Sequence, residues 1–429
     1  MDLIINGENR RLIGEIFVPG DKSISHRSIM IGAIAEGTTR IKNILISEDV
    51  QRTVEAFRSM GVKIEEDKNS FFIEGVGLYG LKKPKTRIDC GNSGTTVRLL
   101  SGIMVGQNFS TTLIGDNSLT NRPMDRIIIP LSKMGGLIQG REDKYLPIEI
   151  KPNKEKLEGI EYELPVASAQ VKSSILLATL YANGSTKIIE KKKTRDHTER
   201  MLNYFGCFLE SKNGEIYMES VPYLSAKDIY VPGDISSAAY FMVAASLIQG
   251  SHIIIKDVGL NPTRIGIIHV LKSMGADIYI FNRRLVNNEP IGDMEIKYSQ
   301  LKGISIGEDI IGTLIDEIPI IAVAASLSKG RTIIKGAEEL KYKESNRLLA
   351  MSRELKKMGA NVTDLDDGMI IEGKNSLNSA YLNSYNDHRI AMALSIAALR
   401  GKGESKIVDH ESINISFPSF YNTLFKLYN

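Results

Sequence analysis

The chain has 429 residues, of which 42% are hydrophobic and 24% charged, and its formal net charge is +3. This length exceeds one typical core, so two or more domains are expected. The small net charge excludes nucleic-acid or membrane binding by an overall field, so anion binding must come from local clusters of Lys and Arg. Cys90 and Cys207 stand alone, which excludes a disulfide framework. Without a signal-peptide or membrane-span pattern, the sequence predicts a cytoplasmic protein.

One pattern recurs six times along the chain: a helix of small and apolar residues, a Gly, and a β-branched strand. It covers residues 28–41, 99–114, 175–189, 241–255, 320–334 and 390–408. Because these helices carry little charge, we expect them to be buried. The Gly after each helix fits a left-handed C-cap; these are Gly37, Gly106, Gly184, Gly250, Gly330 and Gly403.

A second pattern follows the first: an amphipathic helix that ends in Met or an aromatic residue plus Gly, then an alternating hairpin. It covers residues 56–75, 131–140, 202–220, 271–281 and 355–373. The sixth copy, at 420–429, has only the helix, and residues 3–16 have the pattern of the missing hairpin. We therefore predict six βαβαββ units in two α/β domains of three units each. The domains are residues 20–231 and residues 1–19 plus 232–429.

The tetrapeptide VPGD occurs at 18–21 and again at 231–234, where the chain would cross between the predicted domains. We interpret both copies as hinges, because Pro limits the chain and Gly permits a turn. Only the first copy is followed by Lys22 and Arg27; Ile235 and Tyr240 hold the equivalent positions and suit packing. Chance recurrence of a four-residue turn is the alternative.

Several familiar motifs are absent or incomplete. GVGLYG at 75–80 matches the glycine pattern of a dinucleotide site, but Pro84 stands where the helix should begin, so we reject it. No phosphate-binding P-loop occurs. The six histidines never pair at ligand spacing, so no metal site is expected.

Cationic residues instead recur where loops enter the predicted buried helices. The residues that stand out in these motifs are Lys22, Ser23, Arg27, Asn92, Gly94, Arg122, Ser168, Gln170, Lys172, Lys343, Glu344, Arg347, Asp387 and Arg389. Any one of them could be a helix cap with a solvated charge. Together they predict recognition of several anionic groups, because Arg and Lys bind carboxylate and phosphate. Asp316 and Glu344 are candidates for proton transfer, with simple ion pairing as the alternative.

Six motifs in chain order, over the whole chain, resemble the 5-enolpyruvylshikimate-3-phosphate synthase family. They are PGDKSISHR, DCGNSGTTVRLL, NRPMDR, ASAQVKS, YKESNRL and NDHRIAMA, and RDHTE and NPTR resemble its class II subgroup. The resemblance implies an inside-out α/β barrel of two domains, the enolpyruvyl transferase fold. It implies transfer of the enolpyruvyl group of phosphoenolpyruvate to the 5-hydroxyl of shikimate 3-phosphate, with release of phosphate, through a tetrahedral intermediate. It further implies no cofactor, no metal and a monomer without nucleic-acid or membrane partners.

The resemblance also implies roles for individual residues. Asp316 would be the base at the 5-hydroxyl beside Lys343, Glu344 would protonate the methylene carbon of phosphoenolpyruvate, and Lys22 would be catalytic. The phosphoenolpyruvate ligands would be Lys22, Asn92, Gly94, Arg122, Gln170, Arg347 and Arg389. The shikimate 3-phosphate ligands would be Lys22, Ser23, Arg27, Ser168, Ala169, Gln170, Arg195, Asp316 and Lys343.

Two positions depart from patterns within that family. Ile415 stands where some members have a Lys, so one phosphoenolpyruvate contact is missing or supplied by another cation. Gly94 stands where some members that tolerate the inhibitor glyphosate have Ala, which conflicts with the class II motifs and leaves tolerance open.

Two alternative functions remain. A UDP-N-acetylglucosamine enolpyruvyl transferase would carry a reactive Cys, where this chain has Asp116, and a Lys-Asn pair, where it has Lys22 and Ser23. A non-catalytic anion-binding relative would have no reason to keep Asp316 and Glu344 together with Lys22 and Lys343.

Overall fold

The protein is described by a computed structural model covering residues 2–7, 10–67 and 70–428. Helices and strands alternate along it, so the mixed α/β class is confirmed. The chain divides into two compact units. Unit I is Gly20–Val231 with Val286–Glu289, and unit II is Met1–Pro19, Pro232–Leu285 and Pro290–Asn429. Each unit has its own apolar core.

The described residues of unit I form three four-stranded sheets with one plan. In each, a central strand pairs in parallel with a short edge strand and antiparallel with a hairpin. In order across each sheet, the strands are β16 (Ile229–Tyr230), β3 (Glu36–Lys42), β5 (Ser70–Val76) and β4 (Lys63–Asp67); β6 (Ile88–Asp89), β7 (Thr111–Ile114), β9 (Tyr145–Lys151) and β8 (Leu137–Arg141); and β11 (Glu161–Glu163), β13 (Ser185–Ile189), β15 (Glu215–Glu219) and β14 (Leu209–Lys212). A short parallel pair joins β10 (Leu157–Glu158) to β12 (Ala182–Asn183).

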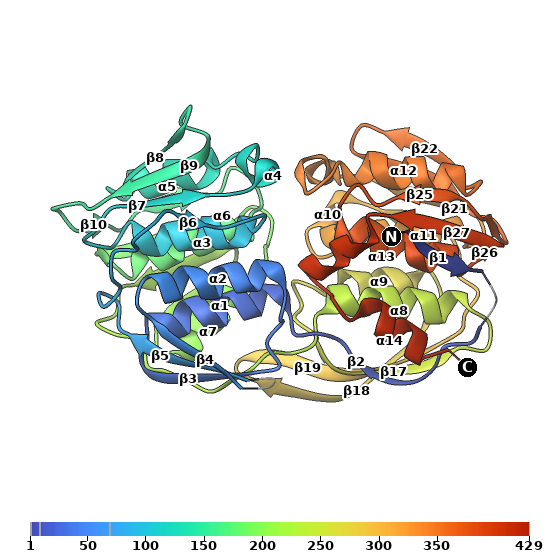
Figure 1. The fold of residues 1–429 in the computed structure, drawn as a ribbon, viewed down its shortest axis with the longest axis horizontal. Coiled ribbons are helices and arrows are strands. Elements are labelled where there is room, and N and C mark those ends of the chain that lie inside the picture. The colour runs from blue at the N-terminus through green and yellow to red at the C-terminus, as the bar shows by residue number, and fades with distance from the viewer. Residues whose placement is uncertain (1, 8–9, 68–69, 429) are drawn as a thin grey trace. The chain divides into compact units, whose positions relative to one another are not determined.

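The helices of unit I divide into buried and outer ones. They are α1 (Lys22–Ala33), α2 (Glu48–Ser59), α3 (Gly94–Met104), α4 (Asn117–Thr120), α5 (Asp125–Lys133), α6 (Ala169–Thr179) and α7 (His197–Tyr204). The apolar helices α3 and α6 pack closely together (Figure 1). A Cβ at Gly102 of α3 would lie 2.2 Å from the carbonyl oxygen of Ser174 in α6, so only Gly permits this approach.

Unit II repeats the same sheet plan in its described residues. Its sheets are β18 (Asp277–Val286), β19 (Glu289–Lys297), β17 (His252–Gly259) and β2 (Ile13–Phe17); β20 (Ser305–Ile306), β21 (Arg331–Ile334), β23 (Gly368–Glu372) and β22 (Asn361–Leu365); and the three strands β1 (Leu3–Asn6), β27 (Glu404–Val408) and β25 (Tyr381–Asn383). A short parallel pair joins β24 (Leu377–Asn378) to β26 (Gly401–Lys402).

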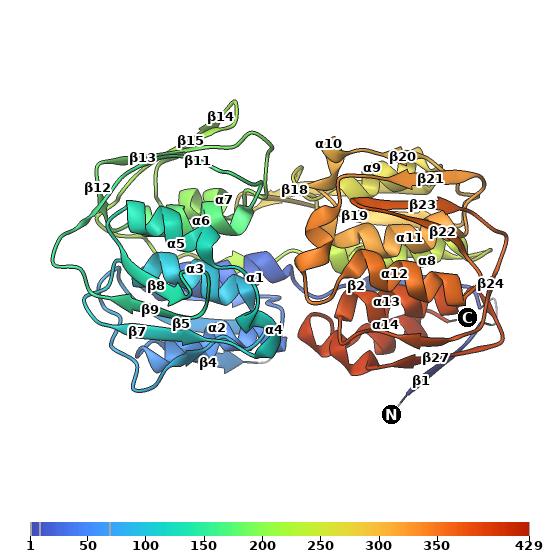
Figure 2. The ribbon, with the colours of Figure 1, turned by 90° about the horizontal axis from the view of Figure 1, so that it is seen from above.

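Three helices form the centre of unit II. They are α8 (Ile235–Leu247), α11 (Ile318–Ser326) and α13 (His388–Ala398). They contact one another, and every residue of α8 and α11 is buried, with strands of the sheets around them (Figure 2). The remaining helical segments are α9 (Gly266–Ser273), α10 (Glu308–Ile311), α12 (Arg347–Lys357), α14 (Phe420–Lys426) and the 3-10 turns η1 (Ile315–Glu317), η2 (Glu338–Tyr342) and η3 (His410–Ile415).

The outer helices α2, α5, α7, α9 and α12 end in one common way. In α2, the N–H of Gly61 donates to the carbonyl of Arg58, and the N–H of Val62 donates to that of Phe57. This is the Schellman arrangement, and it needs a left-handed residue. The equivalent glycines all have positive φ; they are Gly61, Gly135, Gly206, Gly275 and Gly359. The Met-Gly or Phe-Gly signal in the sequence therefore marks real helix ends.

The glycines of the first pattern do not play the expected capping role. Gly330, for example, lies three residues beyond Leu327, the C-cap of α11, so it belongs to the turn before β21. Five of the six have positive φ, but Gly106 does not. At Gly106 a Cβ would lie 2.2 Å from the ring of Tyr181, so close packing explains that glycine.

The N-terminal strands also differ from the prediction. Residues 8 and 9, inside the expected hairpin, lie outside the described residues. In the described part, β1 pairs with β27, whereas β2 pairs in parallel with β17, so each strand joins a different sheet. The hairpin prediction is therefore wrong, because the two strands find their partners in distant segments rather than in each other.

The two VPGD copies lie where the chain passes between the units. The first passage falls between Pro19 and Gly20, and the second between Val231 and Pro232. Within unit II, the N–H of Asp234 donates to the carbonyl of Pro19 over 2.8 Å, so the two copies are joined directly.

Candidate active site

The helices that carry the predicted anion ligands of unit I begin with side-chain caps. Asp21 accepts from the N–H of Ile24 at the start of α1, and Ser93 accepts from the N–H of Thr96 at the start of α3. Ser168, a predicted substrate ligand, caps α6 through the N–H of Val171, and Ala169 is the first residue of that helix. Helix N-termini favour anions, because their free N–H groups and dipoles point outward.

Helix α1 carries a partly exposed Lys at its start and a buried Arg in its second turn. Lys22 forms an ion pair with Asp49, and its side chain is 18% exposed. Arg27 is buried and donates to Thr198 Oγ1 (2.6 Å), the Ser23 carbonyl (2.9 Å) and Ser173 Oγ (2.7 Å). Burial lowers the pKa of Arg27 to about 10, although nearby Glu199 opposes that shift. Three acceptors within unit I thus hold the Arg27 guanidinium in place.

The loop before α3 is held by Arg122. Its Nη2 donates to Asn92 Oδ1 (2.7 Å), and the Asn92 amide donates to Asp116 (2.7 Å). Gly94 starts α3, and a Cβ there would lie 2.8 Å from Nη1 of Arg98. The structure therefore brings the predicted residues Asn92, Gly94 and Arg122 together.

Arg98 is a residue that the sequence reasoning missed. Its Nη1 donates to Gln170 Oε1 (2.7 Å) and its Nη2 to the Pro123 carbonyl (3.2 Å), while the Gln170 amide donates to Thr95 (3.0 Å). Arg98 thus ties the starts of α3 and α6 to the Arg122 loop. Its position four residues after Gly94, on the same helical face, was the available signal.

Lys172 proves unsuitable as a substrate ligand. Its ammonium lies 3.0 Å from Glu190 and 2.6 Å from Glu199, and its side chain is only 1% exposed. The two carboxylates raise the pKa of Lys172 against the lowering effect of its burial. Arg195, by contrast, is half-buried in the loop that leads to α7 and lies close enough to Arg27 to act on its charge.

In unit II, buried Arg347 gathers three carboxylates. It lies 2.5 Å from Glu344, 3.3 Å from Asp316 and 2.8 Å from Asp387. Burial alone would lower the pKa of Arg347, but Asp387 and Glu344 raise it, so the guanidinium stays charged. Asp387 caps α13 through the N–H of Arg389. Two predicted proton-transfer residues therefore share one cation.

Arg389 completes this cluster from α13. Its Nη1 donates to the Asp316 carbonyl (3.3 Å), and its Nη2 lies 3.6 Å from the Asp316 carboxylate. Asp316 offsets the lowering effect of burial and raises the pKa of Arg389. Lys343 follows η2 directly and is half-buried, one residue before Glu344. The structure thus groups Asp316, Glu344, Arg347 and Arg389 by direct contact and Lys343 by chain proximity.

Glu317, beside Asp316, was also missed. It is 1% exposed and accepts a hydrogen bond from Ser236 Oγ, which in turn accepts from Arg264 Nη2 (2.7 Å). Arg264 also pairs with Asp234 over 3.3 Å. This buried network holds η1, and with it Asp316, against the start of α8.

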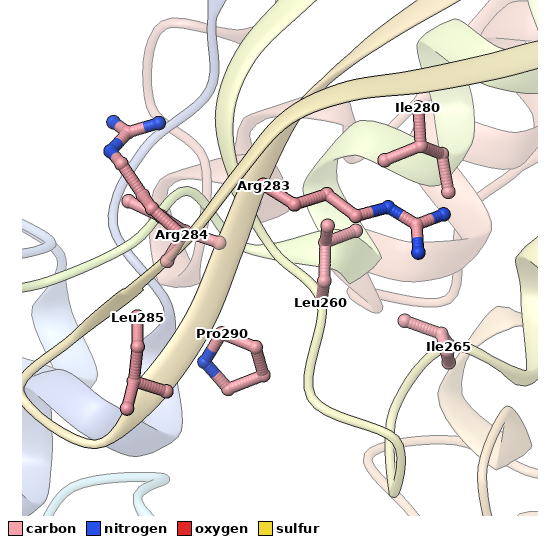
Figure 3. Close-up of a pocket in the computed structure, with 8 residues that line it drawn as sticks. Leu260, Ile265, Ile280, Arg283, Arg284, Leu285 and Pro290 are labelled. Atoms are coloured by element: carbon pink, nitrogen blue, oxygen red, sulfur yellow. The ribbon is translucent and has the colours of Figure 1, made fainter.

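A hollow of about 360 Å³ lies elsewhere in unit II. Its lining is apolar apart from two arginines and consists of Leu260, Ile265, Ile280, Arg283, Arg284, Leu285, Pro290 and Ile291. Figure 3 shows Arg283 running along it and Arg284 pointing to the other side of the strand. None of the predicted site residues lines this hollow, so it is not the candidate site.

Among the described residues, no group of three or more His, Cys, Asp or Glu side chains is placed to hold a metal ion. No helix in the described part of the chain has the length and apolar character to cross a membrane.

A family model described as EPSP synthase (3-phosphoshikimate 1-carboxyvinyltransferase) matches residues 7–424. The chain belongs to the EPSP synthase family. A 3-phosphoshikimate 1-carboxyvinyltransferase of Thermoanaerobacter sp. (strain X514) is 52% identical over 423 residues, with 99% of each chain covered. One of Brevibacillus brevis is 48% identical, covering 97% of this chain and 98% of the relative.

Solved structures agree with this family assignment. EPSP synthase from Acinetobacter baumannii matches with a TM-score of 0.91 and 45% identity, covering 100% of this chain and 98% of that one. The enolpyruvyl transferase NikO from Streptomyces tendae matches with a TM-score of 0.80 at 16% identity, covering 99% and 97%. The second likeness shows the shared fold alone.

Proposed function

We propose that the residues gathered in both units serve one reaction, in which phosphoenolpyruvate and shikimate 3-phosphate give 5-enolpyruvylshikimate 3-phosphate and phosphate. The chain is an enolpyruvyl transferase of the shikimate pathway, which leads to chorismate and the aromatic amino acids. The observation that carries the proposal is Arg347, which holds the carboxylates of both Asp316 and Glu344. An acid and a base fixed around one buried cation suit an addition that must protonate one carbon and deprotonate one hydroxyl.

In the proposed addition step, Asp316 takes the proton of the 5-hydroxyl, with Lys343 beside it. The 5-oxygen bonds to C2 of phosphoenolpyruvate while Glu344 delivers a proton to the methylene carbon, which gives the tetrahedral intermediate. Loss of a proton from the new methyl group and of phosphate from C2 then restores the double bond. The phosphoenolpyruvate anion competes with Glu344 for the N–H groups of Arg347, which frees Glu344 to carry its proton.

Substrate binding is assigned to the cations and helix starts. We propose Lys22, Asn92, Gly94, Arg122, Gln170, Arg347 and Arg389 as ligands of phosphoenolpyruvate. We propose Lys22, Ser23, Arg27, Ser168, Ala169, Gln170, Arg195, Asp316 and Lys343 as ligands of shikimate 3-phosphate. Two contacts support these assignments. The Arg122–Asn92 bond holds the loop before α3, and the Ser168 cap holds the start of α6, so both helix N-termini are fixed, and helix N-termini favour anions.

We also propose the finer architecture: an inside-out α/β barrel of six βαβαββ units, the sixth completed by β1 without a hairpin, with domains 20–231 and 1–19 plus 232–429. The recurrent sheet plan and the repeated Schellman ends support it. The VPGD segments at 18–21 and 231–234 are the proposed hinges. The enzyme is further proposed to act as a cytoplasmic monomer, without a cofactor and without a nucleic-acid or membrane partner.

The test is phosphate release by the purified enzyme, with each substrate omitted in turn. Release that requires both phosphoenolpyruvate and shikimate 3-phosphate supports the proposal. Release with UDP-N-acetylglucosamine as acceptor would assign the rival transferase reaction, and no release with either acceptor would favour a non-catalytic anion binder.

A further inference from the structure

The hairpin of β18 and β19 carries its turn into unit I. The turn sequence is VNNE, and Asn287 and Asn288 have φ values of 50° and 62°. Two consecutive left-handed residues form the two-residue turn that matches the twist of a hairpin, and Asn tolerates that conformation well. The strands belong to unit II up to Leu285 and from Pro290, whereas residues 286–289 group with unit I. The hairpin is therefore a further covalent connection, in addition to the two VPGD segments.

The turn is bound to unit I by specific hydrogen bonds. Asn287 Oδ1 accepts from the N–H of Tyr230 (2.8 Å), and its amide donates to the Asp228 carbonyl (3.0 Å). The Asn288 carbonyl accepts from Arg200 Nη1 over 2.8 Å. A solvent-exposed loop tip has no need of such partners, so this tip is a docked element.

The tip also contacts α7 through the Glu289 carboxylate and the His197 imidazole. Glu289 lies 2.7 Å from Nδ1 of His197, and the two side chains are 7% and 2% exposed. A carboxylate loses much of its hydration at this burial, and the contact with His197 offsets part of that cost.

His197 is the first of three consecutive residues of α7 that each contact a neighbouring element. Thr198 Oγ1 accepts from Nε of Arg27 (2.6 Å) and contacts Ser173 Oγ (2.6 Å). Glu199 pairs with Lys172 of α6. This first turn therefore contributes one of the three acceptors that hold the Arg27 guanidinium, and Arg195 lies two residues before the turn.

We propose that the docked hairpin tip fixes the first turn of α7 and thereby orients Arg27 and Arg195 toward shikimate 3-phosphate. This rests on the proposed function and adds His197, Asn287 and Glu289 to it as positioning residues. They do not touch the substrate. They act through α7 on the residues assigned to the shikimate 3-phosphate anion, and not on the residues assigned to phosphoenolpyruvate alone.

The chain offers a matched control on the same strand. Glu295 of β19 also lies 2.7 Å from a histidine nitrogen, that of His252, but these side chains are 24% and 49% exposed. The described contacts of Glu295 are with His252 and with Lys297 (3.1 Å), neither of which is a predicted site residue, and exposed pairs contribute little. Glu295→Gln therefore makes the same chemical change without the proposed consequence.

The experiment compares steady-state kinetics of the wild type, Glu289→Gln and Glu295→Gln, varying each substrate separately. In Glu289→Gln we expect the KM for shikimate 3-phosphate to rise about 10-fold, as for loss of one charged hydrogen bond. The KM for phosphoenolpyruvate should stay within about 2-fold. Glu295→Gln should match the wild type in both constants.

A second variant guards against misfolding of Glu289→Gln. Asn287→Gly keeps the left-handed turn but removes both side-chain hydrogen bonds, and we expect a smaller rise, about 3-fold, again only for shikimate 3-phosphate. Folded variants with unchanged KM for shikimate 3-phosphate, or with both KM values raised equally, would overturn the inference. A wild type that releases no phosphate would instead overturn the proposed function.

Discussion

The two helices that follow the VPGD copies, α1 and α8, begin alike and then diverge. Asp21 and Asp234 each cap their helix, and both are nearly buried. The next residue is Lys22 in one helix and Ile235 in the other. Lys22 is 18% exposed and reaches Asp49, whereas Ile235 is 1% exposed and belongs to the apolar core.

The difference continues along the first turns. Arg27 donates to three oxygens in unit I, while its counterpart Tyr240 packs edge-on against Phe420, with ring centres 5.8 Å apart. Ser236, the counterpart of Ser23, donates a hydrogen bond to Glu317, the residue next to Asp316. One helix start thus carries the proposed ligands Lys22 and Arg27, and the other is buried and supports the residue next to Asp316, the proposed base.

The largest effect should come from removing the positive charge of Lys22, at the start of α1. Lys22→Met keeps the length of the side chain but loses the ammonium, so we expect kcat/KM to fall about 1,000-fold. The free energy of unfolding in urea should also fall, by up to about 3 kcal/mol, because the Asp49 side chain is only 8% exposed and loses its cation. An active Lys22→Met enzyme would remove the functional distinction between the two copies.

Placing a Lys at the equivalent position of α8 should instead lower the stability of the protein. Ile235→Lys places a charge where the described structure offers only core, and we expect the free energy of unfolding to fall by roughly 3 kcal/mol. Ile235→Leu, as control, should cost about 1 kcal/mol or less. If Ile235→Lys folds normally and lowers kcat/KM as much as Lys22→Met does, the asymmetry is wrong.

A smaller, pH-dependent difference should come from His26, whose counterpart in α8 is Ala239. Burial, and then Lys22 and Arg27, hold the pKa of His26 well below 6.5, so the folded state keeps it neutral while the unfolded state takes up a proton in acid. Its contribution therefore lowers stability as the pH falls below about 6.5, by up to about 1.4 kcal/mol per pH unit.

His26→Asn keeps a partner for Thr53, which lies 2.7 Å from the imidazole, but cannot be protonated. Urea unfolding between pH 7 and pH 5 should show a shallower loss of stability in this variant than in the wild type. Parallel curves for the two proteins would show that His26 does not cause the loss.

The repeat pattern predicted much of the fold, because helix ends and buried helices leave local signals. Met-Gly and Phe-Gly marked the ends of the outer helices, since only a left-handed residue closes the Schellman arrangement. The partner of β2 left no such signal. Its pairing with β17 depends on contacts over more than two hundred residues, which periodicity within one segment cannot reveal.

The sequence predicted which residues lie together in the candidate site better than it predicted the contacts that each of them makes. Arg347, Asp316 and Glu344 were expected to act together and do lie in contact. Lys172 was expected to be another anion ligand, but it is buried and forms ion pairs with two glutamates from distant segments. Arg98 and Glu317 were missed because their roles arise from partners that only the folded chain brings near.

The pairing of β1 with β27 has a consequence for synthesis on the ribosome. Leu3 pairs with Ile407, so the first strand of unit II waits for nearly the whole chain before its partner is made. Most of unit I is one continuous segment that emerges earlier and can fold as it is translated. Strand β1 then has no partner during most of elongation, whereas β2 can pair once β17 has been made, and an unpaired apolar strand is open to aggregation and to chaperones.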